Sequence, residues 1–314
     1  MKHAYLIMAY GDFYLLKKLI QAIDNPEGDI FLHLDAKNTY SASAIADLRA
    51  SVRYSTLNIY SNISVSWGGT SQVLCELFLL KKAASHRYGY YHLLSGQDFL
   101  LKPVHVIQRY YEAHTGEEFL AIDDSAQSCQ DYIDRIDKYH WISKNRRITG
   151  LVDNHFALPL QRMLGVHRLK DADLKYFAKG MNWASMTNAF VSCLLGEEKR
   201  ILHWTRHSIC SDEIYKQMVF KMHQKEFKLH KESDDAGRPE GNATMHWADW
   251  TRGIPYIFCK DDYDELIGMP YMFARKFSSD VDRHIIDWLY AYVTSNEDGA
   301  DADKVSTDKA SGVS

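Results

Sequence analysis

Two adjacent carboxylates in the second half of the chain could do acid–base chemistry or simply cap a helix. Ser211, Asp212 and Glu213 come just before a segment of helical periodicity. Ser or Asp at such a place caps a helix, and acidic residues in a first turn are favoured by the helix dipole. A carboxylate that points into a cleft can instead take a proton from an attacking hydroxyl. Both interpretations stay open, with Glu213 as the candidate general base.

Basic residues gather near the end of the chain, at Arg252 and at Arg275-Lys276. Fixed cations beside a diphosphate can neutralise the charge that develops on a leaving nucleotide, a task that Mg²⁺ or Mn²⁺ performs in other enzymes. Surface salt bridges are the competing interpretation of these residues.

A third set of candidate residues follows the ends of predicted strands: Asp35, SWGG at 66–69 and SGQDF at 95–99. Asp35 could accept hydrogen bonds from a uracil or a ribose. The glycines of SWGG would let the backbone approach a ligand closely, although a Gly-Gly turn is common. Neither GxGxxG nor GxxxxGK[ST] occurs, so the sequence supports neither a dinucleotide fingerprint nor a P-loop.

No motif that would hold a catalytic metal follows directly after a central predicted strand. Asp-x-Asp strings occur at 171–173, 280–282 and 301–303, all in polar or late segments, and Gly-Gln-Asp follows the strand predicted at 88–94. HExxH and GxSxG do not occur. We therefore expect catalysis without a metal and without a cofactor.

The elements that would position these residues alternate between strand and helix. The apolar run at 4–10 is typical of a buried parallel strand, and the apolar spacing at 13–23 predicts an amphipathic helix. This alternation predicts an α/β fold with a doubly wound, mostly parallel sheet, in which ligands bind beyond the carboxyl ends of the strands. Further strands are predicted at 30–35, 57–60, 88–94 and 118–122, and further helices at 70–85, 104–113, 183–195, 212–223 and 280–293.

The chain is predicted to form one large domain with two functional halves and a tail. Residues 1–124 would bind the nucleotide, and residues 125–293 would bind the acceptor and carry the catalytic base. Within the second half, the polar, basic stretch at 125–180 is expected to be an insertion on the acceptor side. Residues 294–314 contain few large apolar side chains and are predicted to be a disordered tail.

Bulk properties exclude several classes of function. With 37 basic and 41 acidic residues the net charge is −4, so no broad positive surface is available for nucleic acid. The five Cys include no CxxC pair, which favours reduced thiols over disulfides or a zinc knuckle. The first apolar run is too short for a signal peptide or a membrane span. These features lead us to expect a cytoplasmic protein.

Several of these segments occur in the order found in one known family. The chain resembles the core-2/I-branching β-1,6-N-acetylglucosaminyltransferases, a family that also contains the peptide O-xylosyltransferases. It looks like a compact bacterial-type member without a membrane anchor. The resembling pieces are AYLIMAY, IFLHLDAK, SWGGTSQV, YYHLLSGQDFLLK, GMNWASMTNAFV, SDEIY, DWTRGIPYIF and FARKF.

The resemblance implies a Rossmann-like GT-A fold, a UDP-sugar donor, inversion at the anomeric carbon and no metal requirement. It implies that Glu213 is the catalytic base and that Asp35 contacts the uridine. It assigns Asp35, Arg252 and Lys276 to the donor and Asp98 to the sugar site, and the further residues expected at the donor are Trp67, Gly68 and Arg275. Those expected at the acceptor side are Lys102, Arg135, Trp183 and Asp212.

Donor and acceptor identity stay open at the level of sequence. N-acetylglucosamine is the expected sugar, with UDP-xylose or UDP-glucose as alternative donors. A catalytically silent protein that binds a UDP-sugar or a carbohydrate is the alternative of a different class. The expected acceptor is a carbohydrate, with lipid-linked and cell-surface glycans as candidates. The basic stretch at 135–170 would either contact the inner face of a membrane or form a solvated loop.

Overall fold

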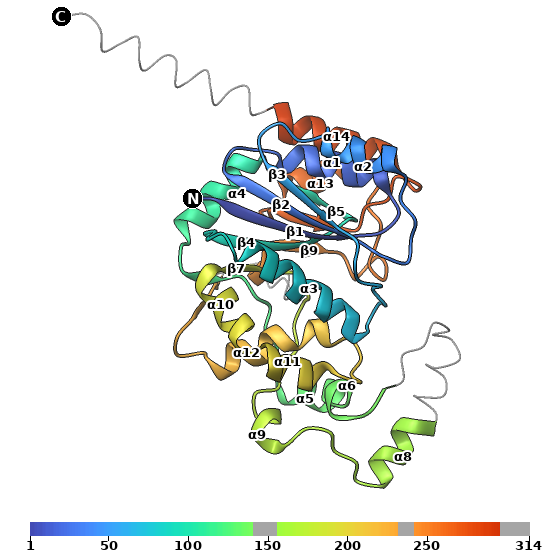
Figure 1. Cartoon of the computed structure of the whole chain (residues 1–314), viewed down its shortest axis with the longest axis vertical. Helices are drawn as coiled ribbons and strands as arrows, with labels where there is room; N and C mark the ends of the chain where they lie inside the picture. The colour runs from blue at the N-terminus through green and yellow to red at the C-terminus, as the bar shows by residue number, and fades with distance from the viewer. Residues whose placement is uncertain (141–155, 232–241, 296–314) are drawn as a thin grey trace, which may run out of the picture.

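The computed structural model describes residues 1–140, 156–231 and 242–295, and a five-stranded sheet forms its centre (Figure 1). The strand order is β3-β2-β1-β4-β7, in which β7 runs antiparallel to β4 and all other neighbours are parallel. These strands are β1 (His3–Ala9), β2 (Gly28–Leu34), β3 (Thr56–Tyr60), β4 (Tyr90–Ser95) and β7 (Ser185–Thr187).

Helices cover both faces of the sheet because side chains along a strand point alternately to its two sides. In β1, Tyr5 and Ile7 belong to the buried cluster shared with α1 and α14, whereas Ala4 and Leu6 belong to the cluster shared with α3. The prediction of a doubly wound, mostly parallel α/β sheet is therefore confirmed. The covering helices are α1 (Phe13–Ile23), α3 (Thr70–Ala83) and α14 (Arg283–Ser295).

A second, three-stranded sheet pairs two strands from the last third of the chain with a strand that follows β4. Its order is β5-β10-β9, and Arg275 in β10 lies opposite both Asp98 and Ala248. This sheet could not be predicted from the sequence, because its strands are only three residues long. The strands are β5 (Asp98–Leu100), β9 (His246–Ala248) and β10 (Phe273–Arg275).

The segment at 183–195, predicted as one helical run, contains a strand and then a helix. Residues 185–187 form β7, which pairs with β4, and α10 begins only at Asn188. The Thr187 hydroxyl accepts a hydrogen bond from Phe190 N at 3.2 Å and so caps the helix at this point. The strand predicted at 118–122 is likewise shorter, because β6 ends at Glu118 and Phe119 forms only an isolated bridge to Ser185.

The remaining elements surround the sheets, mostly below the central sheet in the view of Figure 1. Among the described residues, no helix is both long enough and apolar enough to cross a membrane. Residues 296–314 of the predicted tail and the basic residues 141–155 lie outside the described part of the chain. The remaining elements are α2 (Ala42–Arg49), α4 (Val104–Ala113), β6 (Glu117–Glu118), α5 (Ala126–Tyr132), α6 (Asp134–Asp137), α8 (Leu158–Met163), α9 (Asp171–Leu174), α10 (Asn188–Gly196), α11 (Glu198–Thr205), η2 (Ser211–Glu213), α12 (Tyr215–Met222), β8 (Lys228–Leu229), η3 (Asn242–Thr244), η4 (Lys260–Asp262) and α13 (Tyr263–Gly268).

Candidate active site

The loop that contains SWGG packs against the turn that carries the two adjacent carboxylates. Cys210 N donates to the Gly68 carbonyl oxygen at 2.7 Å, and Thr70 Oγ1 donates to the Thr205 carbonyl oxygen at 2.6 Å. Gly68 has a φ of +70°, and a Cβ atom there would lie 3.2 Å from Cys210 Sγ. A glycine therefore suits this close approach of two loops.

A cavity of about 240 Å³ opens beside this contact. It lies between the start of α3 and the segment that leads to η2, so it adjoins both predicted motifs. Its lining is mostly polar and consists of Ser66, Gly69, Thr70, Ser71, His140, His207 and Ser208.

Glu213 is the more accessible of the two adjacent carboxylates. Its side chain is 31% exposed, and Oε2 lies 2.9 Å from Arg135 Nη1 and 3.9 Å from Lys179 Nζ. Both cations also stack on the ring of Tyr132, at 4.5 Å and 5.0 Å from its centroid. The structure thus brings Arg135, expected at the acceptor side, into direct contact with the candidate base. Lys179 is a further neighbour that the sequence analysis does not identify.

Asp212, in contrast, is buried and points into the protein. It is 7% exposed, and Oδ2 accepts a hydrogen bond from Gln72 Nε2 at 2.7 Å. Burial raises the pKa of Asp212 to about 7, helped by the negative charges of Glu76 and Glu213 and opposed by Lys216. Asp212 therefore anchors the turn to α3, whereas Glu213 stays accessible to a substrate.

A buried ion pair holds this turn in place. Lys216 Nζ and Glu76 Oε2 are 2.8 Å apart, and both side chains are fully buried. Lys216 Nζ also donates to the Asp212 carbonyl oxygen at 2.9 Å and to Asn182 Oδ1 at 2.6 Å. Removing one partner of a buried pair costs about 3–5 kcal/mol because the other charge is left uncompensated. The pair thus fixes α12, α3 and the carboxylate turn relative to one another.

A second group of charged residues lies where β4 leads into β5. Asp98 is fully buried, and Oδ1 lies 3.2 Å from Arg275 Nε. Both Asp98 oxygens also accept hydrogen bonds from Ser95, at 2.6 Å. The Arg275 guanidinium stacks 4.6 Å from the ring centroid of Trp183. Asp98 therefore helps to position Arg275.

Residues 179–183 connect the two groups. Lys179 lies beside Glu213, Gly180 N donates to the Glu213 carbonyl oxygen at 2.9 Å, and Trp183 stacks on Arg275. A Cβ atom on Gly180 would lie 1.8 Å from the Ala121 carbonyl oxygen, so only glycine fits this position. The structure thus brings Glu213, Arg135, Trp183, Arg275 and Asp98 into one contiguous region.

Arg252 is surrounded by acidic side chains. It forms ion pairs with Asp249, with Asp262 at 2.6 Å and with Glu265 at 3.2 Å. Burial raises the pKa of Asp249, but the hydrogen bonds from Arg252 and Thr251 outweigh this effect and lower the pKa to about 2. Arg252 would have to exchange some of these partners to bind a diphosphate.

Lys276 differs from Arg252 because no residue in the described parts of the chain forms an ion pair or a hydrogen bond with its ammonium group. Partial burial, helped by the neighbouring Arg275, lowers the pKa of Lys276. Its backbone joins the loop of Arg252, since Lys276 N donates to the Tyr256 carbonyl oxygen at 3.3 Å. Lys276 is therefore better placed than Arg252 to accept a new anionic partner.

The remaining predicted residues occupy different environments. Asp35 orders the loops after β2 and β3, since Oδ1 accepts hydrogen bonds from Lys37 N and Val65 N at 3.0 Å and 3.1 Å. Trp67 is 61% exposed and follows Ser66, which lines the cavity, in the chain. Lys102 donates to the Ile267 carbonyl oxygen at 2.7 Å, near the end of α13, so its charge satisfies that helix end.

Glu76, Lys216, Gln72 and Lys179 are site residues that the sequence analysis misses. Glu76 lies among apolar residues of α3, where a fully buried acid requires a partner, and this pattern is the available signal for it. Its partner, 140 residues further along the chain, carries no comparable signal. Among the described residues, the side chains grouped so as to hold a metal ion are His114, Glu117 and His230, which belong to other elements.

Comparison with known proteins gives a family and several distant structural likenesses. The sequence model of the Core-2/I-Branching enzyme family matches residues 3–262. No curated protein sequence matches the chain.

Three solved structures are similar to the chain at low identity. Mouse xyloside xylosyltransferase 1 is 10% identical with a TM-score of 0.36, over 87% of this chain and 97% of that one. Core-mannan synthase A from Aspergillus fumigatus, in its Mn/GDP form, is 10% identical with a TM-score of 0.32, over 69% of each chain. TarS from S. aureus is 14% identical with a TM-score of 0.29, and the likeness covers 39% of this chain but only 21% of TarS.

These TM-scores are low, so the assignment depends on the family match. That match spans most of the chain. The protein therefore belongs to the Core-2/I-Branching enzyme family and is a glycosyltransferase.

Proposed function

We propose that the protein transfers a sugar, N-acetylglucosamine in the first instance, from a UDP-sugar to a glycan hydroxyl. Inversion at the anomeric carbon and catalysis without a metal are part of this proposal. The observation that carries it is the arrangement around Glu213. The partly exposed carboxylate of Glu213 belongs to a turn that the buried Lys216–Glu76 ion pair holds in place. Residues 179–183 connect this turn to the basic residues near β10.

The proposed step is a single in-line displacement. An acceptor hydroxyl gives its proton to a carboxylate oxygen of Glu213 while its oxygen attacks the anomeric carbon. The bond from that carbon to the diphosphate breaks, and UDP leaves with the bonding electron pair. Lys276 and Arg275 are proposed to offset the negative charge on UDP, joined by Arg252 once it exchanges a carboxylate partner.

The acceptor would enter beside Arg135 and Lys179. The hydrogen bond from Arg135 and the ion pair with Lys179 fall on Oε2 of Glu213, and Oε1 is proposed to receive the proton of the incoming hydroxyl. Asp35 is proposed to contact the uridine, with Trp67 and Gly68 beside it at the donor. A lipid-linked or cell-surface glycan is the proposed acceptor, and the cytoplasm the proposed location.

Peripheral contact with a membrane would add to this proposal rather than replace it. Helix α8 carries one basic residue in its last turn, Arg162, and exposes apolar side chains on and around it. Sedimentation with anionic vesicles tests this contact, and recovery of all the protein in the supernatant would favour a solvated segment. The exposed apolar residues are Phe156, Leu160, Met163 and Leu164.

A screen of UDP-sugars tests the proposed function. UDP release is measured with UDP-N-acetylglucosamine, UDP-xylose and UDP-glucose, each with and without oligosaccharide acceptors. We expect turnover with one donor and retention of activity in a chelator. UDP binding without release from any donor would favour the silent binding protein instead. Loss of activity in a chelator that Mn²⁺ restores would contradict metal-free catalysis.

A further inference from the structure

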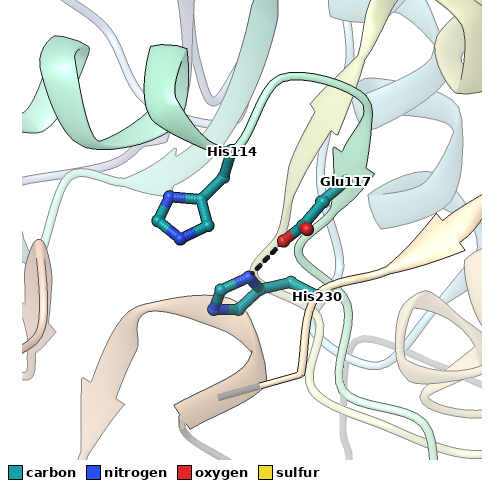
Figure 2. A group of neighbouring side chains, drawn as sticks. All are labelled: His114, Glu117 and His230. Atoms are coloured by element: carbon teal, nitrogen blue, oxygen red, sulfur yellow. Dashed lines mark hydrogen bonds and ion pairs between the residues drawn. The ribbon is translucent and has the colours of Figure 1, made fainter.

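Two histidines and a glutamate from separate segments converge away from the candidate active site (Figure 2). His114 follows α4, Glu117 begins β6 and His230 follows β8. One nitrogen from each histidine and one oxygen of Glu117 all lie within 4.8 Å of one another. Two imidazoles and a carboxylate form a ligand set that Zn²⁺ commonly takes in proteins.

Hydrogen bonds hold the outer atom of each of these side chains. His114 Nδ1 lies 2.8 Å from the Tyr110 carbonyl oxygen, so Nδ1 carries the hydrogen and Nε2 keeps its lone pair. His230 Nε2 lies 3.2 Å from the Tyr110 hydroxyl, and Glu117 Oε1 lies 2.5 Å from Lys228 Nζ. Such outer partners orient the ligands of protein metal sites.

The inner atoms face one another. His230 Nδ1 and Glu117 Oε2 are 2.7 Å apart, a distance that requires one shared proton between them. A divalent ion would take the place of this proton, which would pass to solvent. Three protein ligands would leave the fourth position of a tetrahedral site to water. Lys228 opposes a cation here, but its side chain is 73% exposed, so solvent screens its charge.

Several contacts surround the cluster, which lies at the opposite end of the sheet from Glu213 and Asp98. The Phe119 ring stacks on His230 with centroids 4.2 Å apart. The Tyr90 hydroxyl donates to the carbonyl oxygens of His114 and Glu117, at 2.6 Å and 3.0 Å. Tyr90 is the first residue of β4, whereas Asp98 follows its last residue, and six residues span roughly 17 Å.

We propose that His114, Glu117 and His230 bind a transition-metal ion of the Zn²⁺ class. The ion would connect the end of α4 and the start of β6 to β8, segments more than 100 residues apart in the chain. The proposal gives this ion no part in the transfer reaction, because the residues assigned to that reaction lie elsewhere. The proposal does not depend on the proposed function.

Calorimetric titration of ZnCl₂ into the untagged, chelator-treated full chain tests this site. We expect binding that His114→Ala and Glu117→Gln each weaken by at least about tenfold, the lower end of the effect of losing even an outer partner. His284→Ala is the matched control, because His284 is 74% exposed on α14 and should leave binding unchanged. Equal affinity in all four proteins, or no heat of binding to the wild type, would overturn the proposal.

Two further readouts separate this site from other causes. Zn²⁺ should raise the Tm of the wild type and of His284→Ala but not that of Glu117→Gln. The Tm without metal should be measured for every variant, because a variant that merely folds less well will have a lower metal-free Tm. Co²⁺ should bind without a thiolate charge-transfer band; such a band would assign the metal to the five free cysteines instead. A chelator would also empty this site. The effect of the chelator on sugar transfer should therefore be measured in His114→Ala as well as in the wild type.

Discussion

At the scale of residues, the candidate site combines firmly held side chains with accessible ones. Asp212 is buried and hydrogen-bonded to Gln72, whereas its neighbour Glu213 remains 31% exposed between two cations. Among the basic residues, Arg252 is held by three carboxylates and Lys276 is not. These differences separate residues that maintain the site from residues available to substrates.

Asp212 makes stability depend on pH. Its pKa is raised from 3.8 to about 7 in the folded protein, so the folded state binds a proton that the unfolded chain releases. Stability from this group is therefore present at low pH and is lost as the pH rises from about 4 to about 7. Asp212→Asn should raise stability at about pH 8 by at least about 1 kcal/mol, with little change at about pH 4. Chemical denaturation at both pH values checks this, and an equal effect at both would contradict it.

Lys276 and Arg252 should respond differently to truncation. Lys276→Ala should lower kcat/KM about 10²-fold while leaving Tm unchanged, because the proposed mechanism needs this cation only when charge develops on UDP. Arg252→Ala should lower both kcat/KM and Tm, because it leaves the buried Asp249 and Asp262 unpaired. Steady-state kinetics and thermal melts provide the comparison. A normal kcat/KM in Lys276→Ala would remove this residue from the site.

At the scale of elements, the segment at 179–183 positions both halves of the site. Gly180→Ala should destabilise the protein by about 1–3 kcal/mol, because the new methyl group overlaps the Ala121 carbonyl. It should also lower activity, since Lys179 and Trp183 flank the change. Gly196→Ala is the control: its Cβ would meet no atom within 4 Å, so stability should be unchanged or slightly higher. Similar melting temperatures for the two variants would contradict the role assigned to Gly180.

Elements with strong periodicity can be predicted from the sequence, whereas short ones cannot. The helices predicted at 13–23 and 104–113 are confirmed with the same bounds as α1 and α4, because apolar spacing determines them locally. Strand β7 lies within a run of helical spacing, and only its pairing with β4 makes it a strand. Strand β10 is three residues long and depends entirely on its two partners.

In the candidate site, the positions of the key residues in the chain can be predicted, but their surroundings cannot. Glu213, Arg275 and Lys276 stand in motifs that the resemblance identifies, so their positions in the chain are predictable. Their environments are not, because the contact of Arg275 with Asp98 and the anchoring of the carboxylate turn through Gln72 each join segments more than 100 residues apart. The roles of Asp35 and Lys102 stay predictions.

At the scale of the whole molecule, hydrophobic packing and buried polar networks hold the fold together without disulfides. All five cysteines are free, as the absence of paired spacing predicts. The free energy of unfolding should therefore be the same with and without a reductant, because no cross-link restricts the unfolded chain. Parallel urea titrations check this expectation. A lower midpoint in the reductant would reveal a disulfide that stabilises the protein in solution.

The transfer rate of Glu213→Gln, measured with the donor found by the UDP-sugar screen, tests the central claim most directly. Loss of a positioned general base should lower kcat about 10²–10⁴-fold. The affinity for UDP should be unchanged, because the proposed mechanism assigns Glu213 to the acceptor rather than to the nucleotide. Glu226→Gln, which alters an exposed carboxylate of the same half of the chain, should keep full activity. Near-normal turnover in Glu213→Gln would show that another group removes the proton and would contradict the mechanism.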